Sequence, residues 1–368
     1  MSSPEQPWVL QICHGYDGPF LDCARQYAVL FKGTPYKVCT VYLSGAPSAE
    51  VERGSASDEV IFLDYSGAQL RGLKLGAIAA LKRVAASRNF DLCIAHRFKP
   101  IYVALLATCL PVVGVHHAFG VYSRRARRLF INRFRRRLLL LGVSNAVRDE
   151  MRRHLPNWPT ERVETLYNRI DLDAVQAEQV SRREAREHLQ LPENAWIVGN
   201  VGRLHPDKDQ VTLLRGFAQA LPQLPNASLL VIMGNGRLEG ALKTLAHELG
   251  IAGSVRFLGQ VPHGRRYFKA FDVFALASDH EPFGMVLLEA MAAGVPLICT
   301  ACGGGREVVE GVGQLFELGD AQGLADGLLQ STVMQTETEK MRTRLQQLFS
   351  DQAAVSRFQA LSAVLSEA

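Results

Sequence analysis

Short apolar runs recur along the whole chain, and segments in which apolar residues have helical spacing separate them. In the first half the runs predict buried strands at residues 8–13, 37–43, 60–63, 92–96, 112–116, 139–143 and 163–166. Helices are expected between them at 22–31, at 73–86 and at about 145–154, the last one capped by Ser144 and Asn145. Strands that alternate with helices are typical of a parallel sheet covered by helices on both faces.

The pattern starts afresh in the second half, where strands are predicted at residues 196–200, 229–233, 255–258, 273–276 and 296–299. Helices are expected from the first loop to residue 220, at 238–249 and at 284–293. The polar segment 173–192 is interpreted as the connection between two domains. We therefore predict an α/β protein with two doubly wound, Rossmann-like domains, 1–172 and 173–351, facing a central cleft. The amphipathic segment 352–368 is expected to pack back onto the first domain. Ligands of such sheets bind beyond the carboxyl ends of the strands.

Length and composition agree with this organisation. The chain has 368 residues, of which 48% are hydrophobic and 21% charged, as expected for two globular domains. Its first residues do not resemble a signal peptide, and no apolar run is long enough to span a membrane, so a cytoplasmic location is expected. The seven cysteines are scattered, which favours reduced thiols. Cys299 and Cys302 have the spacing of a metal or redox pair, but no second pair or histidine set completes a site.

Positive charge is concentrated in the first half. No acidic residue occurs from Leu92 to Arg148. Within that stretch lie eight arginines, namely Arg124, Arg125, Arg127, Arg128, Arg133, Arg135, Arg136 and Arg137. Apolar positions at Phe130, Ile131 and Phe134 favour a basic amphipathic helix that lies on an anionic surface. Three interpretations stay open for this cluster: contact with an anionic membrane or a phosphorylated acceptor, an ordinary solvated face, or nucleic-acid binding.

The segment "EPFGMVLLE", residues 281–289, is the most informative motif. Pro282 and Gly284 place Glu281 in a loop, and Glu289 then falls one to two turns inside the following helix. The first amides of that helix can bind an anion. A second motif, "RLHPDK" at 203–208, follows a predicted strand and supplies two cations, Arg203 and Lys208, which suit a diphosphate.

Together with "MGNG" at 233–236 and "GGGREVV" at 303–309, these motifs resemble the retaining glycosyltransferases of family 4, which have the GT-B fold, and among them the bacterial lipopolysaccharide core enzymes. The resemblance implies that the first domain binds the acceptor and the second the nucleotide sugar. In the family the two glutamates contact the donor sugar and the ribose, and these fall on Glu281 and Glu289. The family's diphosphate ligands fall on Arg203 and Lys208. The segment "PVVGVHH" implies that His117, or His116 next to it, lies close to the transferred sugar.

The resemblance also implies front-face transfer with retention of the anomeric configuration, without a metal or another cofactor. Its catalytic residues would be His117, Arg203, Lys208 and Glu281. The full set expected to bind the donor is Gly15, Gly18, Gly202, Arg203, Lys208, Gly234, Pro282, Phe283, Gly284, Met285, Val286 and Glu289. The first glycine-rich loop, "HGYDGPF", departs from the Gly-Gly often found in the family. The resemblance therefore assigns Gly15 and Gly18 to the donor site by their place in this loop and not by an identical motif.

These observations predict a hexosyltransferase that uses a nucleotide-diphosphate sugar, with UDP as the expected nucleotide. The expected acceptor is a saccharide or glycolipid, the lipopolysaccharide core, at the cytoplasmic face of the inner membrane, with the arginine cluster on the membrane or the acceptor and no nucleic-acid partner. Two alternatives stay open. One is a nucleotide-sugar epimerase or hydrolase of the same fold, and the other is a non-enzymatic RNA-binding protein that uses Arg124–Arg137.

Overall fold

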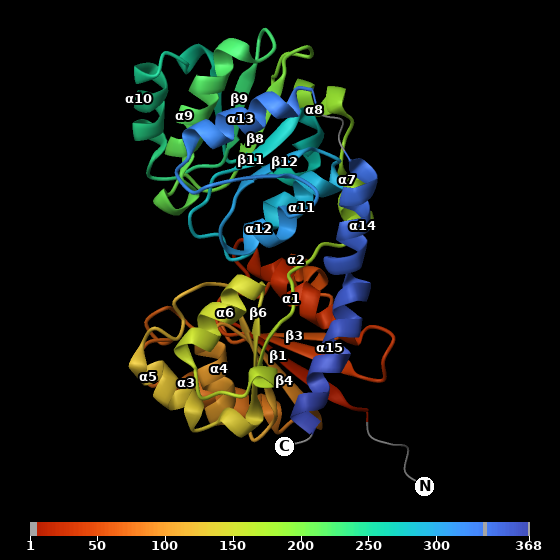
Figure 1. Cartoon of the computed structure of the whole chain (residues 1–368). Coiled ribbons are helices and arrows are strands. Elements are labelled where there is room, and N and C mark those ends of the chain that lie inside the picture. The colour runs from red at the N-terminus through yellow and green to blue at the C-terminus, as the bar shows by residue number, and fades with distance from the viewer. Residues whose placement is uncertain (1–5, 334–336, 367–368) are drawn as a thin grey trace. The chain divides into compact units, whose positions relative to one another are not determined.

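The computed structural model describes residues 6–333 and 337–366, which form two compact units (Figure 1). The first unit consists of the chain up to Asn168 together with the chain from Asp351 onward, and the second consists of Arg169–Ser350. The expected domain boundaries, after residues 172 and 351, differ from these by four residues and one.

The first unit contains a parallel sheet of seven strands in its described residues, in the order β3-β2-β1-β4-β5-β6-β7. The strands are β1 (Trp8–Cys13), β2 (Lys37–Tyr42), β3 (Glu59–Phe62), β4 (Phe90–His96), β5 (Val112–His116), β6 (Leu138–Gly142) and β7 (Val163–Thr165). The helices are α1 (Phe20–Ala28), α2 (Ala49–Gly54), α3 (Leu75–Ala85), α4 (Phe98–Ala107), α5 (Arg125–Asn132), α6 (Asn145–His154) and α15 (Asp351–Ser366). The central strands are buried along almost their whole length, which explains why they appear in the sequence as continuous apolar runs.

The described part of the second unit has a parallel six-stranded sheet with the order β10-β9-β8-β11-β12-β13. Its strands are β8 (Ile197–Val201), β9 (Leu229–Met233), β10 (Val255–Gly259), β11 (Val273–Leu276), β12 (Leu297–Thr300) and β13 (Gln314–Phe316). Its helices are α7 (Leu172–Glu178), α8 (Arg182–His188), α9 (Gln210–Ala220), α10 (Glu239–Glu248), α11 (Met285–Ala292), α12 (Gly303–Val309), α13 (Ala321–Ser331) and α14 (Thr338–Leu348). The predicted α/β class with two Rossmann-like domains is confirmed.

The segment expected to connect the domains is part of the second unit. Ser181 and Glu184 form a capping box that starts α8. The buried Arg186 of α8 donates to Asp272 at 2.8 Å and to the carbonyl oxygen of Ala270, next to the start of β11. This buried ion pair holds the helix on the sheet, so residues 173–192 are not a free linker.

The last helix, α15, packs within the first unit. Phe358 contacts Phe31, with ring centroids 5.7 Å apart. Ion pairs join Arg25 to Asp351 and Arg357 to Glu164. The chain therefore returns to its first unit after it has completed the second one.

Candidate active site

The loop after β8 supplies the two predicted diphosphate ligands. Gly202 and Leu204 donate backbone hydrogen bonds to Met233 and Asn235 of the neighbouring β9 end, at 2.9 Å each. Gly234, with φ of +136°, permits this approach, because a Cβ there would lie 2.0 Å from the carbonyl oxygen of Gly202. The loop is thus held by main-chain contacts, and its side chains are left for other partners.

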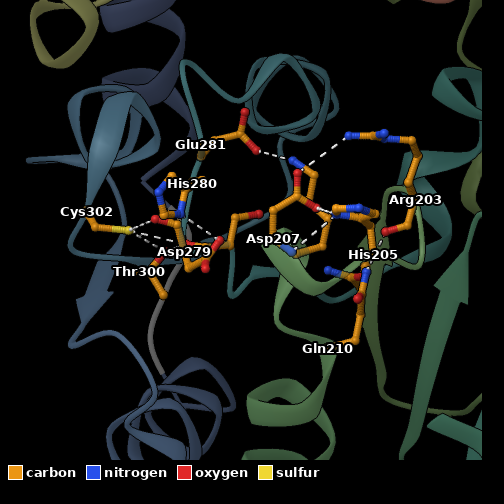
Figure 2. A network of polar contacts seen from close by, with 12 residues as sticks. Arg203, His205, Asp207, Gln210, Asp279, His280, Glu281, Thr300 and Cys302 are labelled. Atoms are coloured by element: carbon orange, nitrogen blue, oxygen red, sulfur yellow. Dashed lines mark hydrogen bonds and ion pairs between the residues drawn. The ribbon is translucent and has the colours of Figure 1, made fainter. Parts of the chain in front are cut away.

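Lys208 lies at the end of a short 3-10 turn, Pro206–Lys208, and its Nζ is 2.6 Å from Oε2 of Glu281. Both side chains are largely buried. Two residues that are 73 positions apart, and that were selected from different motifs, therefore form one ion pair. Figure 2 shows the loop of Arg203, His205 and Asp207 facing the loop of Asp279, His280 and Glu281. A backbone hydrogen bond from Asp279 to Asp207, at 3.1 Å, joins the two loops.

Arg203 is the exposed member of this pair of cations. Its side chain is 71% exposed, and its guanidinium lies 3.5 Å from the carboxylate of Asp207. The same carboxylate accepts from His205 at 2.5 Å. Arg203 can therefore turn toward an anionic ligand at small cost, whereas Lys208 is held in place by Glu281.

The glycine run at 303–305 lets the start of α12 pack directly against the Glu281 loop. Gly304 donates to the carbonyl oxygen of Glu281 at 2.8 Å. A Cβ at Gly304 would lie 2.2 Å from the carbonyl oxygen of Pro282. The "GGG" of the sequence is thus a packing requirement that fixes the backbone of Glu281 and Pro282.

Helix α11 begins after Gly284, which has φ of +92°, and no side chain caps its first turn. The amides expected to bind the donor, those of Phe283, Gly284, Met285 and Val286, lie at this end of the helix. A helix N-terminus favours a phosphate through its amide groups and its dipole. Glu289 lies in the same helix, half-buried, as the spacing predicted.

In the first unit, the two candidate histidines have different surroundings. His116 is fully buried at the end of β5, and its Nε2 lies 2.9 Å from the hydroxyl of Tyr122. His117 is half-buried and follows the strand, and both residues line a cavity of this unit. Burial, assisted by the charge of Arg97, lowers the pKa of His117 to about 3, so this imidazole is neutral at physiological pH.

A chain of hydrogen bonds determines which nitrogen of His117 carries the proton. The amide nitrogen of Gln11 donates to Thr40 and to the carbonyl oxygen of Ala24, so its oxygen faces Nε2 of His96 at 3.4 Å. His96 therefore donates through Nε2 and accepts through Nδ1, which lies 3.1 Å from Nε2 of His117. It follows that His117 is protonated on Nε2, and that its Nδ1 accepts from the thiol of Cys23 at 3.7 Å.

The two remaining glycines expected to bind the donor lie in the first unit, and two further polar residues, Asp171 and Cys302, have structural partners. Gly15 and Gly18 belong to the loop between β1 and α1, where Gly18 has φ of +60°. Asp171 of the Asp171-Leu-Asp173 sequence accepts from the amide of Ala174 and caps α7, which is a structural role. Cys302 donates to the carbonyl oxygen of Ser278, so this thiol also has a structural partner.

The arginine cluster does not form the single helix that the sequence suggested. Helix α5 ends at Asn132, and a separate 3-10 turn covers Arg135–Arg137. Three arginines have internal partners: Arg127 and Arg128 donate to carbonyl oxygens of residues 121–123, and Arg137 donates to those of Thr108 and Leu110. Five are exposed and have no ion pair with any described residue: Arg124, Arg125, Arg133, Arg135 and Arg136.

Sequence reasoning missed several residues near the candidate histidine. Gln11, Cys23 and His96 are polar groups inside or beside apolar runs, and Arg97 and Lys99 follow the end of β4. Arg97 and Lys99 could have been predicted from the sequence, since charged residues at the carboxyl end of a parallel strand lie at the ligand-binding edge of the sheet.

Comparison with known proteins agrees with the two-unit architecture. The family model described as Glycosyltransferase Family 4 matches residues 33–174, and the one described as Glycosyl transferases group 1 matches residues 181–347. The two Rossmann-like sheets and these matches define a protein of the GT-B class. The chain belongs to the group 1/family 4 glycosyltransferases, as its motifs indicated.

Among curated relatives, the lipopolysaccharide core biosynthesis glycosyltransferase LpsE of Rhizobium meliloti (strain 1021) is 34% identical over 162 residues. This match covers 44% of the present chain and 45% of LpsE, so the chain spans less than half the length of this relative.

Two solved structures show the same fold over nearly the whole chain. A glycosyltransferase from Rickettsia africae ESF-5 has a TM-score of 0.83 at 15% identity, covering 99% of this chain and 100% of the other. Anabaena Alr3699/HepE, solved in complex with UDP and glucose, has a TM-score of 0.76 at 21% identity and coverages of 98% and 99%. Within the described residues, no helix combines the length and the apolar character needed to cross a bilayer.

Proposed function

We propose that the protein is a retaining glycosyltransferase that moves a sugar from a nucleotide-diphosphate sugar, with UDP as the nucleotide, to a saccharide acceptor. The observation that carries the proposal is the ion pair between Lys208 and Glu281, with Arg203 on the adjoining loop and the uncapped start of α11 following Glu281. This arrangement combines cations, the amides of a helix end without a side-chain cap and a carboxylate, which a sugar diphosphate requires. The relative solved with UDP and glucose supports the choice of donor.

In this proposal the charge that develops on the leaving diphosphate is stabilised by Arg203, by Lys208 and by the first amides of α11. Glu281 keeps the Lys208 ammonium in position before the donor arrives, and its second oxygen would contact the sugar. An ammonium has three donors, so Lys208 can keep its bond to Glu281 and still bind a phosphate oxygen. Glu289 would bind the ribose. We propose no metal or other cofactor in this reaction.

The acceptor in this proposal is the lipopolysaccharide core, reached at the cytoplasmic face of the inner membrane. The name of the relative LpsE supports the acceptor. The five exposed arginines support contact with an anionic surface, because none of them has an acidic partner among the described residues.

Donor binding by the full chain tests the central claim. Titration calorimetry with UDP-glucose, GDP-glucose and ADP-glucose should give saturable binding of the UDP sugar. Arg203→Gln should weaken it about 10- to 100-fold, since a hydrogen bond to a charged group contributes about 1.5–3 kcal/mol. Because Arg203 is exposed, this variant should fold normally. Glu289→Ala should weaken binding as well.

Lys243→Met is the matched control, because Lys243 pairs with Glu239 at 2.6 Å on the exposed face of α10. It should bind the donor as the parent protein does. If none of the three nucleotide sugars binds, or if Arg203→Gln binds with unchanged affinity, the proposed function is wrong.

A further inference from the structure

A cavity of about 310 Å³ opens in the first unit, and the residues that line it all belong to that unit. Its walls come from the start of α1, from the turn between β4 and α4, and from the chain between β5 and α5. The volume is within the range of small-molecule sites in proteins.

Three cations line this cavity: Arg97, Lys99 and Arg127. None of them forms an ion pair with a carboxylate of the described residues. The guanidinium of Arg97 lies over the ring of Phe20 at 4.7 Å, and that of Arg127 lies over Phe98 at 4.7 Å while it donates to the carbonyl oxygen of Val121. The charges of all three are therefore left without a local counter-ion.

The acidic groups close to the cavity do not cancel this charge. Glu150 accepts from the amide of Gly120 and pairs with His154, so it is already engaged. Burial lowers the pKa of His14, the charges of Lys99 and Arg97 lower it further, and Asp17 opposes them. The neighbouring His117 is uncharged, as shown above. The positive potential therefore comes from the three permanent cations.

The backbone adds to the same potential. Arg97 has φ of +75°, and its amide donates to the carbonyl oxygen of Val115 at 2.8 Å. It immediately precedes the ten-residue helix α4, whose first turn has no side-chain cap. A non-glycine residue at positive φ is strained and is found preferentially at functional sites. The helix dipole places further positive potential at this end.

The rest of the wall is apolar and aromatic, made by Phe20, Phe98, Pro100 and Phe119. A few charged groups set in an apolar wall are typical of a site for an organic anion, since the apolar part excludes water and the cations fix the orientation. Three uncompensated cations suit a phosphate monoester, which carries a charge of about −1.5 to −2 at neutral pH.

We propose that this cavity binds a phosphorylated saccharide, with its phosphate on Arg97 and Lys99 and its sugar against the aromatic wall. Its role as the acceptor site rests on the proposed function; the binding of a sugar phosphate does not. The neutral His117, whose two ring nitrogens are engaged by His96 and Cys23, then presents the uncharged ring itself to the sugar.

The test measures binding of glucose 6-phosphate and of glucose to the full chain without any nucleotide. Glucose 6-phosphate should bind at least about 10-fold more tightly, and Arg97→Gln and Lys99→Gln should each remove about 10-fold or more of that affinity. Arg97→Lys should retain most of it. Arg83→Gln, an exposed arginine on α3, makes the same change of charge and should have no effect.

Three results would overturn the proposal: no preference for the phosphate, an equal loss in Arg83→Gln, or weaker UDP binding in Arg97→Gln, which would assign the cavity to the donor. Vesicles of phosphatidylglycerol distinguish a lipid headgroup as the source of the phosphate. Arg97→Gln should bind these vesicles as the parent protein does. If Arg97→Gln loses vesicle binding while its affinity for glucose 6-phosphate is unchanged, the proposal is also overturned. If glucose 6-phosphate binds but no nucleotide sugar does, only the proposed function fails.

Discussion

At the scale of single residues, the first unit keeps three histidines uncharged, namely His96, His116 and His117. Burial lowers the pKa of His116 to about 3, and the positive charge of Arg127 adds to this effect. The pKa of His96 is likewise well below its usual value because the ring is buried. In the unfolded chain these side chains return to a pKa near 6.5.

This difference predicts how stability depends on pH. Below pH 6.5 the unfolded state protonates His116, whereas the native state keeps it neutral down to about pH 3. The free energy of unfolding is therefore at its full value above pH 6.5 and decreases as the pH falls toward 3. Between these two pKa values, each such histidine lowers the free energy of unfolding by about 1.4 kcal/mol for every unit by which the pH falls. The free energy of unfolding, measured at pH 7.5, 6.0 and 5.0, should therefore fall less steeply with decreasing pH in His116→Gln than in the parent protein. The exposed His247→Gln should keep the parent slope, and an unchanged slope in His116→Gln would contradict a neutral His116.

At the scale of elements, the arginine cluster is divided between structure and surface. Arg128 and Arg137 bind backbone carbonyl oxygens, so they hold α5 and the following turn onto the unit. The sequence does not distinguish these residues from their exposed neighbours, because the local spacing of the arginines is the same whether the side chain binds a backbone carbonyl oxygen or lies on the surface. Their distant partners, Thr108 and Leu110 for Arg137, decide the role.

Membrane contact should depend on the exposed arginines alone. Replacing Arg125, Arg133, Arg135 and Arg136 with glutamine should remove up to about 4 kcal/mol of binding to anionic vesicles, at about 1 kcal/mol for each cation. Co-sedimentation with vesicles of phosphatidylglycerol measures this loss. The same change of charge at Lys32, Arg53, Lys82 and Arg83, which are exposed elsewhere in this unit, is the control. Equal losses in the two variants would show that only net charge matters.

At the scale of the whole molecule, the chain leaves the first unit at residue 168 and returns to it at residue 351. The returning helix α15 buries Phe358, which is 4% exposed, against Phe31. Stability of the first unit therefore depends on residues that follow the entire second unit.

Phe358→Ala should destabilise the first unit by about 3–5 kcal/mol, the usual cost of removing a buried aromatic ring. Hydrogen exchange measured by mass spectrometry should show faster exchange in β1, β4 and β6 and no change in β8 or β11. The exposed neighbour Gln359→Ala should leave both units unchanged. Faster exchange confined to the second unit would contradict this assignment of α15.

Much of the fold was determined by local pattern. Buried parallel strands are continuous apolar runs, so twelve of the thirteen described strands were predicted close to their observed positions. The exception, β13, is an edge strand of which only Phe316 is buried, so it produces no apolar run. Lys208 and Glu281 were selected as candidates because their motifs combine charge with loop-forming residues at the ends of strands. The sequence did not show how α8 is held on the second sheet, because its Arg186 pairs with a distant residue, Asp272.

The sequence by itself determined the positions of the apolar runs that form the strands of the two sheets, and it supplied the candidate residues proposed to bind a diphosphate. Only the tertiary structure decided which of these side chains meet. The order β1-β4-β5 brings Gln11, His96 and His117 into one hydrogen-bonded chain. The same order gathers the cations of the cavity, because neighbours in a parallel sheet come from distant parts of the chain.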